Sequence, residues 1–417
     1  MPSFAHLSDV HIGAFRQPSL QKLVLDAFNT ALDVCLQRKV DFVVVSGDLF
    51  DSNIPDMGLV NSAVKKIREV RENGIPFYII YGSHDFSPTQ TSIVDILESA
   101  GLFVKATKGT MEDGRLELEF TLDKQTGAKL CGISGRRLGI EREYYEVLNR
   151  ESLEKEQGFK IFLLHGALTE YKPKHLAQAD SLPLSLLPRG FAYYAGGHLH
   201  ERLEEGEHGY RVAYPGALFG ADYSDLERSA KGLERGFFVV NFTKGVEKAE
   251  FVPVTVCRYE MKEYEAEGKN STKVQNDLLE LVRNVETKGK VFLLKVTGEM
   301  SGGKTSDIDF QQLKRTLKDA GAMEVLLNYQ QLTSKEYTAV RVAGEDIKDI
   351  EDALLKENIG AVRVSNPKLK GQAGVDLSRD VLRIWKQARP DNEAKTTYDQ
   401  RVTSETIDTL GIGEYFE

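Results

Sequence analysis

The chain has 417 residues, of which 41% are hydrophobic and 28% charged, a globular balance with length for two or three domains. No apolar run approaches the ~20 residues of a membrane span, and strand-like sequence begins almost at Met1 in place of an export signal, so we expect a cytoplasmic protein with no membrane partner. The formal net charge of -9 excludes a general attraction to nucleic acid, and the three separated cysteines suggest neither a disulfide framework nor a CxxC site.

Five short apolar runs in the first two hundred residues each end in polar side chains. In chain order, these side chains are Asp9 and His11; Asp48 and Asp51; Ser83, His84 and Asp85; His165; and His198 and His200. Helical patterns over residues 20–37 and 59–72 separate the first three runs, which predicts β-α-β units and a largely parallel sheet. Because sites in such sheets form beyond the carboxyl ends of the strands, all five endings should converge there.

Two carboxylates and four imidazoles at one sheet edge predict a pair of transition-metal ions, since imidazole favours Mn, Fe, Co or Zn and carboxylates suit harder ions. Asp48 is placed to bridge two ions about 3.5–4 Å apart, an arrangement that activates water for phosphoryl displacement. We expect the other ligands to divide between the ions: Asp9, His11 and His200 around one, and Ser83, His165 and His198 around the other.

The remaining histidines of this region are expected to act differently. A histidine taken alone is more often structural than a ligand, but six of the eight histidines are His6, His11, His84, His165, His198 and His200, and five of these directly follow an apolar run. His6 lies inside the first strand, so we predict a packing or supporting role for it. His84 is left over as the acid that protonates the leaving oxygen, and Asp85 should orient its loop or the imidazole.

The ordered set DxH, GDxxD, GSHD, H and GHxH resembles the calcineurin-like metallophosphoesterases. The segment "SGDLFDSNIP" and residues 214–240 are similar to the SbcD or meiotic-recombination-eleven nuclease family in an archaeal-like form. The resemblance implies an α/β fold: a four-layer α-β-β-α sandwich over residues 1–250, a smaller α+β capping domain over residues 270–365, and a helical tail over residues 366–417.

The resemblance also implies an activity and partners. Members of this family are Mn-dependent DNA nucleases, with double-strand exonuclease and single-strand endonuclease activity, that act on DNA ends in double-strand-break repair. By resemblance we expect two Mn²⁺ per chain, a homodimer formed through helices near residues 59–71 and 93–97, a coiled-coil ABC-type ATPase bound by the tail, and nucleoid association.

Carried over position by position, the resemblance assigns Asp9, His11, Asp48 and His200 to the first ion, Asp48, His165 and His198 to the second, and catalysis to His84. Two positions depart from the commoner family pattern. Ser83 stands where many members have Asn, and Asp51 where several have a second active-site histidine. Because a serine hydroxyl reaches about one bond less than an Asn carbonyl, we expect a weaker second metal site. Asp51 and Asp85 are expected to hold the metal ligands in position without binding an ion themselves.

The second half of the chain predicts a small α+β unit after a charged boundary stretch at residues 259–271. The pattern of residues 290–360 predicts the order strand, helix, strand, strand, helix. This small α+β arrangement is consistent with the capping domain. Within them "GEMSGGKT", residues 298–305, fits the phosphate-loop pattern. We do not expect nucleotide binding there, because the unit is small and no apolar strand ending in a magnesium-binding Asp follows.

The tail and three loop arginines complete the predicted contacts. Leu377, Val381, Ile384 and Trp385 fall on one helical face, with Ser378 as an N-cap, and a second short helix follows near residues 403–413. By resemblance this face binds the ATPase, with Trp385 as its anchor. The candidates for contact with the DNA backbone are Arg16, Arg136 and Arg137.

Two other functions are compatible with the sequence. The same metal ligands serve small-molecule phosphatases and cyclic-nucleotide phosphodiesterases. That hypothesis accounts for residues 1–250 only and leaves the second half of the chain unexplained. A scaffold that tethers DNA ends with little catalysis is motivated by Ser83.

Overall fold

The computed structural model describes residues 1–85, 91–136, 141–173, 176, 180–206, 210–335, 351, 354–356, 359, 371–390, 393 and 395–411. These residues divide between two compact units: the described parts of Met1–Tyr264, Leu278–Val296 and Phe310–Gln330 form unit 1, and those of Glu265–Asp277, Thr297–Asp309 and Gln331–Glu417 form unit 2. Among the described residues, no helix combines the length and apolar character needed to cross a membrane.

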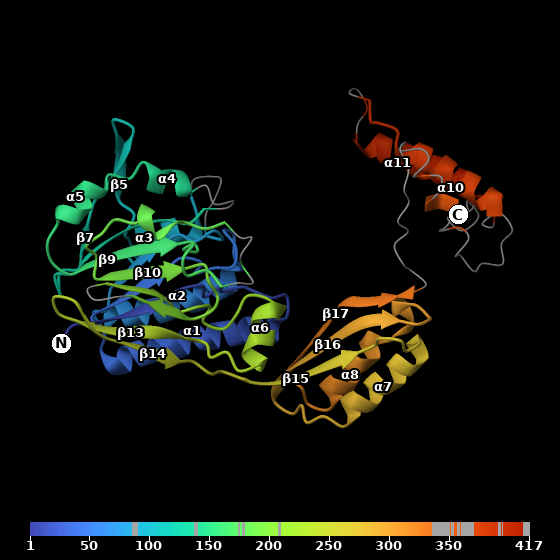
Figure 1. Cartoon of the computed structure of the whole chain (residues 1–417), viewed down its shortest axis with the longest axis horizontal. Helices are drawn as coiled ribbons and strands as arrows, with labels where there is room; N and C mark the ends of the chain where they lie inside the picture. Colours follow the sequence, from blue (N-terminus) through green and yellow to red (C-terminus); the bar gives the residue numbers. More distant parts are fainter. Residues whose placement is uncertain are drawn as a thin grey trace. The chain divides into compact units, whose positions relative to one another are not determined.

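Unit 1 is built on two six-stranded sheets (Figure 1). The first has the order β14 (Val246–Pro253), β13 (Gly236–Phe242), β1 (Ser3–Leu7), β2 (Phe42–Ser46), β3 (Phe77–Ile80) and β4 (Val104–Lys105). The second has the order β11 (Leu203–Glu205), β12 (Arg211–Tyr214), β10 (Tyr193–Gly197), β9 (Lys160–His165), β8 (Lys129–Ile133) and β7 (Thr121–Leu122). Strands β1 to β4 are parallel, as are β8, β9, β10 and β12, while the remaining strands pair antiparallel. The predicted β-α-β start of a parallel sheet is confirmed.

Strict alternation along the central strands creates the layers. In β2, Phe42 and Val44 belong to the apolar cluster between the sheets, whereas Val43 and Val45 belong to the cluster that includes helices α1 (Pro18–Arg38) and α2 (Met57–Glu72). In β9, Ile161 faces the inter-sheet cluster and Phe162 faces a third cluster. Because successive strand residues point to opposite faces, strands buried on both sides read as continuous apolar runs. Three apolar layers require four structural layers, so the predicted α-β-β-α sandwich is confirmed.

The helices of unit 1 begin where local chemistry favours a start. Helix α1 carries Pro in its first turn, where no amide hydrogen is needed. The Asp56 carboxylate caps α2 by accepting the amide hydrogens of Gly58 and Leu59. Short elements complete the unit: α3 (Ile93–Ser99), β5 (Gly109–Glu112), β6 (Arg115–Leu118), α4 (Arg142–Glu146), α5 (Arg150–Lys155), the 3₁₀ turn η3 (Leu184–Leu186) and α6 (Tyr223–Ala230).

A three-stranded sheet with order β15-β16-β17 contributes residues to both units. Its elements are β15 (Arg258–Glu265), α7 (Ser271–Arg283), β16 (Lys290–Met300), the 3₁₀ turn η4 (Thr305–Asp307), α8 (Phe310–Asp319) and β17 (Glu324–Ser334). The predicted strand-helix-strand of residues 290–331 is confirmed. The charged stretch at residues 259–271 is not simply a connection, because most of it forms β15. The strand and most of the helix predicted after residue 335 lie outside the described residues.

The phosphate-loop pattern takes a different form in the structure. Its first residues belong to β16, and a single 3₁₀ turn follows it in place of a helix. The Asp307 carboxylate accepts hydrogen bonds from the Lys304 amide at 2.6 Å and the Ser271 hydroxyl at 3.2 Å. A protein carboxylate thus takes a donor that a bound phosphate would use.

The tail forms two helices, α10 (Gly371–Trp385) and α11 (Lys395–Leu410). The prediction that Ser378 caps the first helix is wrong, because α10 begins seven residues earlier and Ser378 lies within it. The second helix is also longer than predicted. Ile384 is buried and Leu377 and Val381 are half-buried, whereas Trp385 is 60% exposed.

A buried polar bridge joins the sheets behind the site. His6 of β1 lies 3.0 Å through Nδ1 from the Tyr193 hydroxyl of β10 and 2.9 Å through Nε2 from the Ser46 hydroxyl of β2. Ser46 in turn donates to the Ala195 carbonyl. His6 therefore donates from Nε2 to Ser46, and in the neutral ring its Nδ1 accepts the Tyr193 hydroxyl hydrogen. Burial lowers the pKa of His6 to about 3, and the predicted supporting role of this residue agrees with its contacts.

We predict that His6 makes stability fall on acidification. Its folded pKa of about 3 lies below the unfolded value of 6.5, so the unfolded chain binds the additional proton and folding loses free energy as the pH drops from 6.5 toward 3. Between pH 6.5 and 5 this single group should cost about 2 kcal/mol. Urea unfolding of the metal-free proteins at both pH values should show that the change in the free energy of unfolding differs by this amount between the unaltered chain and His6→Gln. An equal pH dependence in both proteins would contradict the assignment.

Candidate metal centre

Backbone and side-chain hydrogen bonds fasten the predicted ligand loops to one another. The amides of Asp9 and His11, which follow β1, donate to the carbonyls of Gly47 and Asp48, which follow β2, at 3.2 and 3.0 Å. The His198 amide, which follows β10 of the other sheet, donates to both oxygens of the Asp9 carboxylate at 2.9 and 3.0 Å. The carboxyl ends of strands from both sheets thus meet at one site, as predicted.

The backbone at this site is unusual. Among the described residues, seven non-glycine residues have positive φ, and four of these are predicted ligands: Asp9 (49°), His11 (51°), Asp48 (51°) and His198 (88°). A side chain in this region costs of order 1–3 kcal/mol, and such strain clusters at functional sites. The loops therefore hold these four ligands in backbone conformations that cost free energy.

Glycines make room for the ligands at two points. A Cβ on Gly82 would lie 2.1 Å from the Asp48 carboxylate, and a Cβ on Gly197 would lie 2.0 Å from the Ser46 carbonyl oxygen. Neither position can accept a side chain without moving the site. Gly82 thus lets the loop after β3 pass directly against the predicted bridging residue.

Asp9, His11 and His200 form one candidate ligand group, with ligand atoms within 4.8 Å of one another. The Nε2 atoms of His11 and His200 are 3.2 Å apart. Each ring meets a carboxylate through Nδ1: His11 meets Asp51 at 3.2 Å, and His200 meets Asp225 at 2.6 Å. A ring that donates from Nδ1 presents a lone pair at Nε2, so two lone pairs converge. Such a pair repels unless a cation lies between, which fits a metal ion.

Asp48 and His165 form the centre of a second group, together with Asp9. His165 Nδ1 lies 2.8 Å from the Ser46 carbonyl oxygen, to which only N–H can donate. Its Nε2 is buried 3.1 Å from an Asp48 oxygen and has no hydrogen-bond partner among the described residues. A buried ring nitrogen without a hydrogen-bond partner, beside a buried carboxylate, fits a site for a second cation. The His198 ring lies 5.4 Å from the His165 ring, and the Ser83 hydroxyl lies 3.5 Å from Asp48.

The electrostatics of the site favour positive charge. Burial disfavours charge on His165, yet the carboxylates of Asp48 and Asp9 raise its pKa to about 10. Burial likewise disfavours charge on Asp48, yet His165 and His11 hold its pKa well below the ordinary range. By contrast, desolvation and the charge of His165 lower the pKa of His198 to about 4. Two carboxylates that favour the charged form of a buried imidazole would equally attract a divalent cation.

His84 is half-buried beside these groups. Its amide donates to Asp48 at 2.8 Å, and its Nδ1 donates to the Asp51 carbonyl at 2.7 Å. The ring packs edge-on against His11 with centroids 4.9 Å apart, and Nε2 is left for chemistry. A ligand atom of His84 also lies within 4.8 Å of those of His11 and Asp48. The geometry therefore places His84 next to a candidate ligand of the first ion and to the predicted bridging residue.

Asp51 and Asp85 lie behind the predicted ligands, where the sequence suggested. Asp51 contacts His11 through its side chain and His84 through its carbonyl. Asp85 accepts the amide hydrogens of Leu49, Phe50 and Gly82 at 3.0–3.3 Å, so it orients the loops and not an imidazole. Burial and the nearby charge of Asp48 raise the pKa of Asp85 to about 6.

The three loop arginines that were predicted to contact DNA differ in their surroundings. Arg16 is exposed. Arg136 donates through its amide to Glu141 and stacks 4.9 Å from the Tyr144 ring. Arg137 lies outside the described residues.

Comparison with known proteins gives the family. Residues 2–202, which include every predicted ligand, match the family described as calcineurin-like phosphoesterase. A relative from Archaeoglobus fulgidus, named DNA double-strand break repair protein Mre11, is 25% identical over 99% of this chain and 99% of its own length. Residues 2–202 therefore match the calcineurin-like phosphoesterases, and the chain is similar to an Mre11 protein along almost its whole length. This family is a divalent-metal enzyme class, and among the described residues the groups that could hold a metal ion are formed by Asp9, His11, Asp48, His84, His165 and His200.

Further relatives carry the same printed name. The protein from Sulfurisphaera tokodaii is 33% identical over 47% of this chain and 48% of its own length, and that from Methanocaldococcus jannaschii is 26% identical over 85% and 88%. Among solved structures, a dimetal phosphatase from Danio rerio matches 61% of this chain and 99% of its own, with 11% identity and a TM-score of 0.38.

Sequence reasoning missed two residues of the site, Asp225 and Arg235. Burial opposes ionisation of Asp225, but the hydrogen bond from His200 and the charge of Arg235 hold its pKa well below the usual range. A ligand histidine needs a hydrogen-bond acceptor at its second nitrogen, and this need was the only indication in the sequence that a residue such as Asp225 belongs to the site. The sequence around Asp225 offers several acidic residues, so the signal could not select one.

We predict that Ser83→Asn strengthens the second Mn²⁺ site. A longer side chain with a carbonyl oxygen should reach an ion beside Asp48 and His165, raising its affinity about tenfold, or ~1.4 kcal/mol. A Mn²⁺ titration followed by electron paramagnetic resonance resolves the two sites. Ser62→Asn, on the exposed face of α2, is the matched control. Unchanged second-site affinity in Ser83→Asn would count against Ser83 as the weak point.

Proposed function

We propose that this chain is a Mn²⁺-dependent nuclease that acts on DNA ends in double-strand-break repair. The observation that carries the proposal is the convergence of two buried carboxylates with the Nε2 nitrogens of His11, His165 and His200. Similarity to the Archaeoglobus fulgidus Mre11 along almost the whole chain supports DNA as the substrate. The proposed activities are exonuclease action on duplexes and endonuclease action on single strands.

On this proposal two Mn²⁺ ions are held by the loops. Asp9, His11 and His200 would hold the first, Ser83, His165 and His198 the second, and Asp48 both. Bound ions supply activation of water and neutralisation of the phosphate charge. The mixed imidazole and carboxylate set suits Mn²⁺ better than Mg²⁺.

His84 is the proposed catalytic residue. The Asp51 carbonyl fixes the ring through Nδ1, so Nε2 is the nitrogen that delivers a proton to the leaving oxygen. Asp51 also meets His11, so this one residue orients both a proposed ligand and the proposed acid. In-line displacement then requires that the attacking water and the leaving oxygen lie on opposite sides of the phosphorus, with the leaving oxygen toward this nitrogen.

Partners extend the proposal beyond the site. Arg16, Arg136 and Arg137 are proposed to touch the DNA backbone. Exposed apolar side chains at Met57 of α2 (58% exposed) and Ile96 of α3 (56% exposed) support a homodimer through these helices. The α10 face with Leu377, Val381, Ile384 and Trp385 is proposed to bind the coiled-coil ABC-type ATPase. We propose domain boundaries at residues 1–250, 270–365 and 366–417.

We predict that His84→Ala loses DNA cleavage but keeps its metal ions. Loss of a proton donor to the leaving group should reduce the rate by about 10²–10⁴-fold, while Mn²⁺ affinity changes little. Cleavage of labelled duplex and single-stranded DNA, with a parallel Mn²⁺ titration, measures both. Full cleavage by His84→Ala would remove this residue from the chemistry.

The same assay separates the alternatives. Hydrolysis of bis-p-nitrophenyl phosphate by the unaltered chain without cleavage of either DNA would favour a small-molecule phosphatase or cyclic-nucleotide phosphodiesterase. DNA-end binding without any hydrolysis would favour a tethering scaffold.

We predict that removing residues 371–417 abolishes association with the ATPase and preserves hydrolysis of bis-p-nitrophenyl phosphate, because every proposed ligand precedes residue 201. In the full chain, Trp385→Ala should weaken association at least tenfold, since an exposed tryptophan is a common anchor of interfaces. Arg383→Ala, on an exposed neighbour in α10, is the control. Co-purification at wild-type level by the truncated chain would refute the assignment of the tail.

A further inference from the structure

Asp225 stands directly behind His200. Asp222 caps α6 by accepting the Asp225 amide at 2.9 Å, which sets Asp225 in the first turn. One Asp225 oxygen lies 2.6 Å from His200 Nδ1 and also accepts the Ala221 amide at 2.9 Å. The residue is only 2% exposed. The carboxylate therefore has a fixed position and can impose an orientation on the imidazole.

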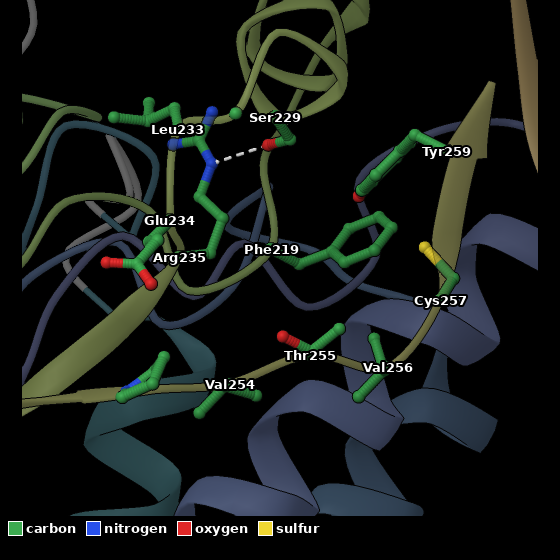
Figure 2. Close-up of a pocket in the computed structure, with 12 residues that line it drawn as sticks. Phe219, Ser229, Leu233, Glu234, Arg235, Val254, Thr255, Val256, Cys257 and Tyr259 are labelled. Atoms are coloured by element: carbon green, nitrogen blue, oxygen red, sulfur yellow. Dashed lines mark hydrogen bonds between the residues drawn. The ribbon is translucent and has the colours of Figure 1, made fainter.

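Arg235, which directly precedes β13, forms hydrogen bonds with both His200 and Asp225. Its Nη1 donates to the His200 carbonyl, and its Nη2 lies 2.8 Å from the Asp225 carbonyl and 3.3 Å from the Asp225 carboxylate. Its Nε donates to the Ser229 hydroxyl at 2.9 Å (Figure 2). At 7% exposure, nearly every contact of this guanidinium is internal. One side chain thus fixes His200 at its backbone and, through Asp225, at its ring.

The backbone of Arg235 is itself anchored. Its carbonyl accepts the Val254 amide at 2.8 Å, just after β14 ends. A pocket of about 220 Å³ is lined by Arg235 and, among other residues, by Val254, Thr255, Val256, Cys257 and Tyr259 (Figure 2). A buried ion pair is weak evidence for stability, because the cost of desolvation can exceed the attraction. The contacts of Arg235 and Asp225 with His200 indicate that this ion pair has a role at the metal site and is not explained by stability alone.

We propose that Arg235 is a positioning residue for the metal ligand His200, acting through Asp225. The proposal rests on the metal site of the proposed function and adds the residues that aim one of its ligands. Partners that hold a ligand histidine through its second nitrogen commonly contribute 10–100-fold to metal affinity. Arg235 lies one contact further out, where its rigid fork can hold a carboxylate and a carbonyl together.

The test is a Mn²⁺ titration of the full-length chain without DNA, followed by electron paramagnetic resonance. Asp225→Asn and Arg235→Ala should weaken one of the two sites 10–100-fold and leave the other unchanged. Arg235→Lys should fall between Arg235→Ala and the unaltered chain, because an ammonium replaces only part of the fork. Arg202→Ala, which removes a half-exposed arginine two residues after His200, is the control and should bind both ions normally.

A double-mutant cycle separates positioning from folding. In a His200→Ala background, Arg235→Ala should cause no further loss of Mn²⁺ affinity, since its effect passes through His200. Wild-type affinity at both sites in Arg235→Ala, or an equal additional loss in the His200→Ala background, would overturn the proposal. If Arg235→Ala does not fold, Arg235→Lys and the isosteric Asp225→Asn give the same comparison.

The outcomes distinguish this proposal from the proposed function. An unaltered chain that binds two Mn²⁺ ions but cleaves no DNA would refute the nuclease and leave the positioning role intact. An unaltered chain that cleaves DNA, with Arg235 variants that bind metal normally, would refute only the positioning role.

Discussion

The site depends on one electrostatic constraint: two buried carboxylates, Asp9 and Asp48, share a sheet edge with the open nitrogens of several imidazoles. Asp9 is fully buried and Asp48 is 2% exposed, so solvent screens neither charge well. Their ligand atoms lie within 4.8 Å of one another and of His165. Without a cation this cluster is self-repelling, and the raised pKa of His165 shows how strongly the field attracts positive charge.

The rest of unit 1 serves to hold that unfavourable cluster together. The two sheets bring strand ends from distant parts of the sequence to one place, and strained loop residues such as His198 (φ 88°) aim the ligands. The His6 bridge locks β1 to β10 just behind the site. Each ligand imidazole with a defined partner donates from Nδ1, so the same nitrogen, Nε2, faces inward each time. The fold thus fixes both the position and the protonation pattern of the ligands.

The four layers and the ligand loops could be predicted from the sequence because both are local patterns. Strands buried on two faces are continuous apolar runs, and each polar ending follows its run directly. Other features depend on contacts far apart in sequence. Asp225 is 25 residues from His200, and only the placement of α6 selects it from neighbouring acids. Strand β15 was missed because its many charged residues resemble a connection, and α10 was predicted too short because Gly371 and Gly374 are poor helix formers.

The central claim is that this edge binds two metal ions through the named ligands. Anomalous scattering at the manganese edge, measured on crystals soaked in Mn²⁺, tests it most directly. The account predicts two peaks about 3.5–4 Å apart, with Asp48 between them, Asp9, His11 and His200 around one, and His165 and His198 around the other. A soaked crystal with no peak at this edge, or with a peak bound by other residues, would contradict it.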